Sequence, residues 1–186
     1  MGIVKRKSFT LIELIVAVGI VGLVLPAVFS IIFSIMRQQL VLISYQEMKL
    51  QGDSAQRNIK NILQNRAAYV TANSSYDVTT NACSLLPAPT PTYAPDIYVV
   101  DREGHWIHLS FTGSKIASIA ADIGVNKTYN LTSSDVTISN LDFGFSCYRI
   151  NEFTPVTVST KFTIQKSTVF KDISLPYSFN TRLRNY

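Results

Sequence analysis

An uncharged apolar run near the N-terminus dominates the hydrophobic pattern of this chain. From Leu14 to Met36 no residue is charged. The run has about 23 residues, which as a helix would measure about 34 Å and could cross the hydrocarbon core of a bilayer. A secretory signal core is shorter, at about 7–15 residues. Pro26 is expected to kink the helix or to loosen one turn of it, because proline lacks an N–H and its ring clashes with the preceding turn. The pattern predicts a transmembrane helix.

An amphipathic pattern follows the apolar run. Between residues 38 and 70, apolar residues recur at intervals of three, four and seven positions, and polar residues occupy the opposite face of the predicted helix. The apolar residues are Met48, Ala55, Ile59, Ile62 and Leu63. This spacing predicts a helix that packs on a sheet and extends to about Val70. Some irregularity is expected at Gly52 and Asp53, because glycine is a poor helix former.

The remaining residues, 71–186, predict a β-rich domain. The segment from Thr71 to Pro95 carries four prolines and many small polar residues, which indicates a surface loop. Strand candidates follow at hairpin spacing: Asp96–Asp101, Trp106–Phe111, Lys115–Ala121, Val136–Ile150, Val156–Ser167 and Ser174–Leu183. The expected fold class is α+β, with a long N-terminal α-helix, its first half transmembrane, packed on a C-terminal antiparallel β-sheet.

The net charge of +5 is concentrated at the N-terminus. Without Lys5, Arg6 and Lys7, 14 basic residues face 12 acidic ones, and no dense basic stripe remains. A nucleic-acid-binding surface is therefore not favoured. The positive-inside rule places these three residues in the cytoplasm and everything after Arg37 outside.

The two cysteines, Cys83 and Cys147, belong to no CxxC pair and to no cluster with zinc spacing. In a domain exported to an oxidising compartment, two isolated cysteines indicate one disulfide. The alternative is two unrelated buried thiols.

A short motif precedes the apolar run. The stretch Lys5-Arg6-Lys7-Ser8-Phe9-Thr10-Leu11-Ile12-Glu13 resembles the processing site of type IV prepilins, which has a short basic leader, a cleavage point before Phe and a Thr-Leu-Ile-Glu stretch that leads into a long apolar helix. That family usually has glycine before the cleaved bond. This chain has Ser8, which retains a small residue there.

The resemblance implies a function without catalysis or a cofactor. A prepilin peptidase would cut between Ser8 and Phe9 and methylate the new amine of Phe9. The chain would have a leader at 1–8, a transmembrane and assembly helix at 9–37, an amphipathic helix at 38–70 and the β-rich domain at 71–186. Its expected partners are that peptidase, other pilin or pseudopilin subunits, an inner-membrane assembly platform, and membrane lipid before assembly. It would wait in the cytoplasmic membrane with its N-terminus inside, and then enter a pilus or pseudopilus.

Glu13 carries the assembly hypothesis. An unpaired carboxylate at the mouth of an apolar run is costly. The resemblance implies that Glu13 pairs with the Phe9 amine of a neighbouring subunit, which suits a role in setting register more than in adding stability. The alternative is an interfacial glutamate in contact with headgroups and water.

Signals for other functions are weak. His105 and His108 flank Trp106-Ile107, and the sequence places no further metal ligands near them, so no metal site is expected. No nucleophile elbow or phosphate loop is present.

The Ser8 departure, together with the long amphipathic segment and large β-rich domain, favours a minor, priming or tip subunit over a major pilin. The rival hypothesis is a permanently anchored extracytoplasmic enzyme or binding module that keeps residues 1–8.

Overall fold

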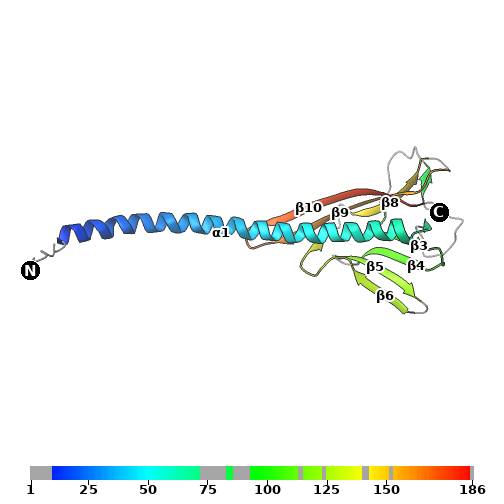
Figure 1. The fold of residues 1–186 in the computed structure, drawn as a ribbon, viewed down its shortest axis with the longest axis horizontal. Helices are drawn as coiled ribbons and strands as arrows, with labels where there is room; N and C mark the ends of the chain where they lie inside the picture. The colour runs from blue at the N-terminus through cyan, green and yellow to red at the C-terminus, as the bar shows by residue number, and fades with distance from the viewer. Residues whose placement is uncertain are drawn as a thin grey trace, which may run out of the picture. The chain divides into compact units, whose positions relative to one another are not determined.

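The structure is a computed structural model that describes residues 10–71, 83–85, 93–112, 115–122, 125–139, 143–150 and 153–184. The chain divides into two compact units, Met1–Ile43 and Ser44–Tyr186. We call the second unit the head. The fold is α+β, as the sequence predicts, with one long N-terminal helix followed by strands that are almost all antiparallel (Figure 1).

The helix α1 extends from Leu11 to Asn61 and continues as a π-helical segment, η1, from Ile62 to Arg66. It passes through Pro26 without a break. The irregularity expected at Gly52 is absent, and that expectation is wrong. The irregular geometry lies instead in η1, and the helical part of the chain ends before Val70.

In the described part of the head, the strands form two sheets. The first sheet has the order β1-β3-β4-β5-β6, and the second has β10-β9-β8-β2, with β7 also paired to β9. The strands are β1 Tyr69–Thr71, β2 Ser84–Leu85, β3 Asp96–Val100, β4 Trp106–Thr112, β5 Lys115–Asp122, β6 Val125–Asn130, β7 Thr137–Ile138, β8 Gly144–Arg149, β9 Thr157–Ser167 and β10 Asp172–Arg182. All pairs are antiparallel except β2 with β8, which is parallel.

The strand predictions need correction at several places. The sequence pattern missed β1, which lies at the expected end of the helix, and β2, which lies in the expected loop Thr71 to Pro95. The expected strand Val136–Ile150 is divided into β7 and β8. The sequence pattern also missed β6, whose residues Val-Asn-Lys-Thr-Tyr-Asn are mostly polar. This strand lies at the edge of the first sheet, and from Lys127 to Asn130 its residues are exposed, so no apolar alternation marks it.

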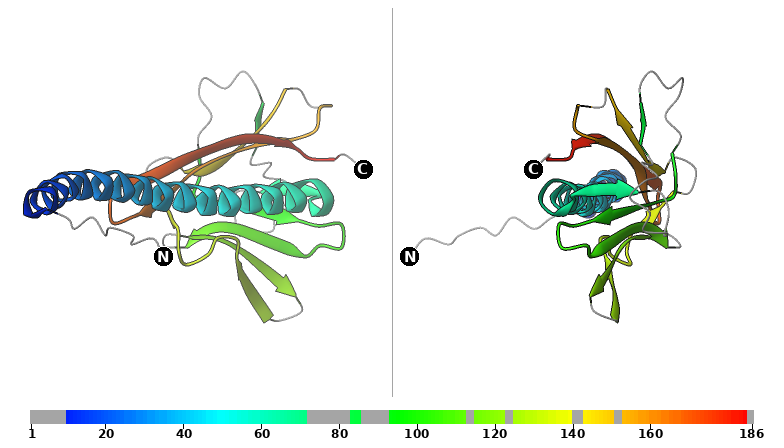
Figure 2. Two further views of the ribbon diagram at one scale, coloured as in Figure 1. Left: turned by 60° about the vertical axis from the view of Figure 1, so that its left-hand side comes forward. Right: turned by 90° about the vertical axis from the view of Figure 1, so that its right-hand side faces the viewer.

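The core of the head surrounds one stripe of the helix. Fully or almost fully buried residues recur every three or four positions along it: Met48, Gly52, Ala55, Ile59 and Leu63. The four with apolar side chains, all except Gly52, belong to one hydrophobic cluster with residues of both sheets. The cluster includes Val99, Leu109 and Ile116 of the first sheet and Phe145, Phe162 and Ile164 of the second. Within the head, α1 thus runs between the two sheets (Figures 1 and 2).

Gly52 lies against the side chain of Tyr177 in β10. A Cβ at this position would overlap the ring of Tyr177. The Tyr177 ring also stacks on Phe162, with centroids 5.0 Å apart. Its hydroxyl lies 3.2 Å from both the Lys49 carbonyl and Asp53 Oδ1. The glycine therefore serves close packing between α1 and β10, not flexibility.

Replacing Gly52 by alanine is expected to lower the free energy of unfolding of the head by about 1–3 kcal/mol, because overpacking a filled site outweighs the helix propensity that alanine gains. Thermal unfolding of the detergent-solubilised chain measures this. Gly22→Ala is the matched control, since Gly22 lies in the same helix and a Cβ there would meet no neighbouring side chain within 4 Å. An equal effect of both substitutions would contradict the packing argument.

The pKa of Tyr177 is raised to about 12, chiefly by burial of its hydroxyl group. The negative charge of Asp53, the hydrogen bond between Tyr177 and Asp53, and the nearby Tyr45 raise it further. Because this value exceeds the unfolded pKa of about 10, the stabilisation is complete below pH 10 and is lost as the pH rises toward 12. Between these values, the wild type is expected to lose more unfolding free energy than Tyr177→Phe, by about 1 kcal/mol, because the ring is only partly buried and solvent screens the charge. Urea unfolding at pH 9 and 11.5 tests this, and parallel pH profiles would contradict it.

Candidate functional site

The N-terminal unit presents an apolar helix that no other described residue of that unit covers. Between Leu11 and Met36 all the large apolar side chains are exposed, with Leu23 at 80%. The most apolar window of the helix reaches a mean hydropathy of 2.8. By length and composition this one helix could cross a membrane. In water such a surface is unfavourable, so lipid or protein must cover it.

Glu13 is the one acidic residue in the first turn of α1. Its Oε2 accepts hydrogen bonds from the Thr10 backbone N–H and from Thr10 Oγ1, both at 3.0 Å. Thr10 directly precedes the helix, and Glu13 is three residues further on, which is the spacing of a capping box. The carboxylate therefore satisfies a backbone donor at the start of its own helix.

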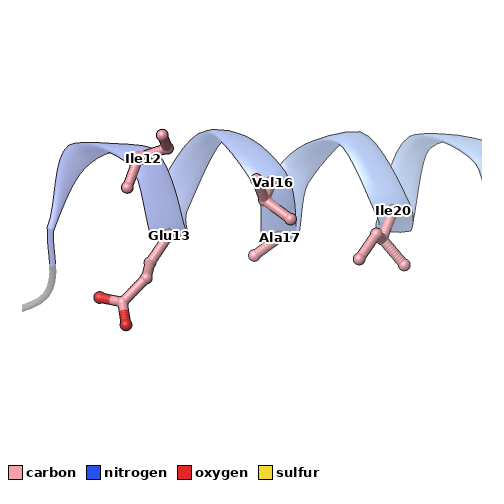
Figure 3. Close-up of a pocket in the computed structure, with 5 residues that line it drawn as sticks. All are labelled: Ile12, Glu13, Val16, Ala17 and Ile20. Carbon is pink, nitrogen blue, oxygen red and sulfur yellow. The ribbon is translucent and has the colours of Figure 1, made fainter.

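The surface beside Glu13 is apolar. Figure 3 shows the Glu13 side chain directed away from the helix, with Ala17 and Ile20 following on the same side. Together with Ile12 and Val16 these residues line a shallow hollow around the carboxylate. A group that bound here would therefore need one positive charge for Glu13 and apolar surface for its neighbours.

Two predicted site residues, Ser8 and Phe9, lie outside the described residues. The cleavage and methylation assigned to them stay predictions. Thr10, the residue that bonds Glu13, was not singled out from the sequence. The Thr-x-x-Glu spacing of Thr10 and Glu13 was the signal that could have identified it.

The predicted disulfide between Cys83 and Cys147 is present, with Cα atoms 4.7 Å apart, and it leaves neither cysteine of the chain free. Cys147 lies in β8, and Cys83 directly precedes β2. The two strands pair in parallel next to the bond, through Ser84 with Tyr148 and Leu85 with Arg149. The bond therefore fixes a short strand to the second sheet.

The expectation that no other metal ligand lies near His105 is wrong. The turn between β3 and β4 brings one ligand atom each of Asp101, Glu103 and His105 within 4.8 Å of one another. Asp101 Oδ1 accepts the backbone N–H groups of Glu103 and His105, at 2.9 and 2.8 Å, and Asp101 Oδ2 lies 3.2 Å from His105 Nδ1. His108 is separate and lies 3.3 Å from Asp96 Oδ2.

Burial raises the pKa of the Asp101 carboxyl, but hydrogen bonds from His105 and Glu103 lower it more, so the pKa lies below its ordinary value. These are the bonds of an Asx-type turn that closes the β3–β4 hairpin. The closeness of Asp101, Glu103 and His105 is therefore accounted for by their part in stabilising the β3–β4 hairpin. A hollow beside it is lined by Arg66, Trp106, Lys127 and Tyr129 as well.

No protein-family model, curated protein or solved structure matches this chain.

Proposed function

We propose that the chain is a structural subunit of a type IV pilus or related pseudopilus, processed by a prepilin peptidase and assembled through its N-terminal helix. The observation that carries the proposal is a single carboxylate, Glu13, directly before the uncharged helical segment Leu14–Met36, whose large apolar side chains are all exposed. It stands in the Phe-Thr-Leu-Ile-Glu stretch that resembles the prepilin processing site.

In such a subunit, two different environments shield the exposed apolar helix from water, one before assembly and one after it. Lipid covers Leu14–Met36 while the subunit waits in the membrane, because an α-helix satisfies its own backbone hydrogen bonds there. Other subunits cover the same surface after assembly. The basic leader stays in the cytoplasm and the head lies outside, an orientation that the positive-inside rule favours. A disulfide in the head is in keeping with an oxidising compartment.

Glu13 would exchange partners on assembly. Before assembly, its carboxylate has a local donor in Thr10. In the filament it would pair with the new amine of Phe9 from a neighbouring subunit, inside an apolar core. A buried pair adds little net stability, but a missing partner is costly, so the pair selects one register of neighbouring helices. The head and its disulfide would remain folded throughout this exchange. We place the chain among the minor, priming or tip subunits.

The mature chain is expected to begin with a methylated Phe9. Mass spectrometry of protein from sheared filaments measures its N-terminus. Ser8→Gly should be processed as well as the wild type or better, and Ser8→Leu should accumulate with residues 1–8 attached, because the peptidase site is expected to accept only a small side chain before the cut. Intact residues 1–8 in assembled wild-type protein would support instead a permanently anchored enzyme or binding module.

A further inference from the structure

The head has a groove between the end of its helix and the edge strand β6. Two hollows of about 350 and 410 Å³ form this groove, and both are lined by Arg66 and Tyr129. Each volume falls in the range of about 300–1,000 Å³ that is usual for small-molecule sites. The first hollow is further lined by Asn58, Asn61, Ile62, Ser118 and Leu131, and the second by Asp101, Glu103, His105, Trp106, Ile107, Ala120 and Lys127. We call the two hollows together the β6 groove.

The register of the first sheet places Tyr129 and Lys127 on the side of the sheet that carries the core. Tyr129 pairs with Ser118, which pairs in turn with the fully buried Leu109. Directly paired residues of neighbouring strands project from the same face of a sheet, and Lys127, two residues before Tyr129, shares that face. Both side chains are nevertheless exposed, and β6 lies on the far side of β5 from α1 (Figures 1 and 2). The groove therefore forms because β6 extends the first sheet beyond the part that α1 covers.

Arg66 stands where the two hollows meet, and its charge is not neutralised within the head. It is exposed and lies at the end of η1. No carboxylate of the described residues lies within ion-pair distance of its guanidinium. The other lysine or arginine of the lining, Lys127, has its Nζ 5.3 Å from the centre of the Tyr129 ring. A ligand carboxylate at this point would pair with the planar Arg66 guanidinium through two hydrogen bonds.

The carboxylates of the groove lie at one end of it, in the β3–β4 turn. Asp101 is already engaged by hydrogen bonds within the turn. The Glu103 side chain is 79% exposed, and its Oε2 lies 3.4 Å from His105 Nδ1. A ligand that occupies the second hollow therefore meets hydrogen-bond donors at Arg66 and an exposed acceptor at Glu103.

This mixture of groups fits a saccharide better than a nucleic acid. A sugar hydroxyl both donates and accepts hydrogen bonds, so it can bond to donors and acceptors alike. The apolar C–H face of a sugar packs on an aromatic ring, and Tyr129 is 49% exposed. A nucleic-acid backbone instead presents negative phosphates, which Glu103 would repel, and its bases need successive aromatic rings. Trp106 supplies no second ring, because it alternates with the buried Ile107 and projects from the opposite face of the sheet.

We propose that the β6 groove binds an acidic saccharide, a uronic acid unit of a polysaccharide, with its carboxylate on Arg66 and its C–H face on Tyr129. Hydroxyl groups of the same saccharide bond to the exposed amides of Asn58 and Asn61 in the first hollow and to Glu103 in the second. The proposal goes beyond the pilus-subunit function and does not depend on it, because every residue of the groove belongs to the head.

The test measures binding of uronic acid trisaccharides to the detergent-solubilised full chain by isothermal titration calorimetry. The probes are the trimers of galacturonic acid and of mannuronic acid. The control ligand for each is its methyl ester, which keeps the sugar rings and removes the charge. At least one acid trimer is expected to bind, and esterification should weaken its binding at least tenfold, because hydrogen bonds between charged groups are stronger than those between neutral ones.

Three variants locate the site. Arg66→Gln should weaken binding of the acid trimer at least tenfold, and this loss should not add to that from esterification, because both remove the same charge pair. Tyr129→Ala should weaken binding of the acid trimer by about threefold or more. Arg57→Gln is the matched control and should have no effect, since Arg57 is also an exposed arginine of the helix but lines neither hollow.

No binding of either acid trimer at millimolar concentration would overturn the proposal. So would equal losses for Arg66→Gln and Arg57→Gln, which would indicate attraction by the net positive charge alone. A single-stranded oligonucleotide or a triglutamate peptide that binds more tightly than both trimers would identify a nucleic acid or an acidic peptide as the ligand instead. Esterification changes no residue, so the comparison of acid with ester decides the question even where a variant folds poorly.

Discussion

Replacing Glu13 by alanine is expected to leave the chain in the membrane but to reduce its incorporation into filaments by more than a hundredfold. Removing a charge makes the apolar segment easier to insert. In the filament, however, the Phe9 amine of a neighbouring subunit would be buried without a partner. Breaking a buried pair in this way costs on the order of 3–5 kcal/mol, which corresponds to the expected loss. Glu13→Gln should be partly impaired, since it keeps a hydrogen bond but not the charge.

The capping bond with Thr10 requires a control of its own. Glu13→Ala also removes the acceptor for the Thr10 N–H and Oγ1. Losing such a cap costs about 1 kcal/mol. Thr10→Val removes the hydroxyl donor and keeps the Glu13 carboxylate, so its incorporation should fall by no more than several-fold. The contrast between these two variants separates pairing with a neighbour from local capping.

The measurement is the ratio of filament-associated to membrane-retained protein for the wild type and the three variants. The melting temperature of the head should be the same in all four, because Glu13 and Thr10 lie outside the compact unit that begins at Ser44. Equal incorporation ratios would show that Glu13 is only an interfacial residue.

The helix and its buried stripe could be predicted because both have a local signature. Burial of Met48, Ala55, Ile59 and Leu63 repeats at the helical period, which sequence alone displays. The role of Gly52 has no such signature. Its partner Tyr177 lies on the last strand, and only the folded chain shows that the ring occupies the space of a side chain. Taken alone, the glycine indicated a weak point in the helix.

For the strands too, local features could be predicted from the sequence, whereas pairings between distant segments could not. β3, β4, β5, β9 and β10 are rich in branched or aromatic residues and were predicted to within about two residues. Their division into two sheets depends on pairings between distant segments. The parallel pair β2–β8 is set by two residues beside a disulfide, and no local pattern encodes it.

Of the candidate site, Glu13 was predictable because a carboxylate is conspicuous at the edge of an apolar run. Its bond to Thr10 is encoded by spacing and could have been predicted. The approach of Asp101 and Glu103 to His105 depends on the shape of a turn. Turn residues are easier to locate in a sequence than their side-chain positions are to infer.

Removing the disulfide is expected to produce the largest change in the stability of the head. Cys83 and Cys147 are 64 residues apart. A closed loop of that size stabilises by very roughly 4 kcal/mol in the chain-entropy model, because it restricts the unfolded chain. For a domain of this size the melting temperature should fall by roughly 8–16 °C. The expected change exceeds that for Gly52→Ala.

The single variants Cys83→Ala and Cys147→Ala should each lose nearly as much stability as the double variant, because either one breaks the same bond. Reductant should lower the melting temperature of the wild type by a similar amount and leave the double variant unchanged. Losses that add up across the two single variants would indicate instead that each side chain contributes through its own packing, independently of the bond.

The loss should begin locally at β2 before the whole head unfolds. That strand pairs with β8 through two residues, too few to persist without the adjacent covalent bond. In the reduced protein, the amides of Ser84 and Leu85 should exchange with solvent at rates near those of an unfolded peptide, while the amides of β9 and β10, paired over eleven residues, stay protected. Hydrogen exchange resolved by residue makes this comparison within one sample. Retained protection at β2 after reduction would show that packing, and not the disulfide, holds this strand in the second sheet.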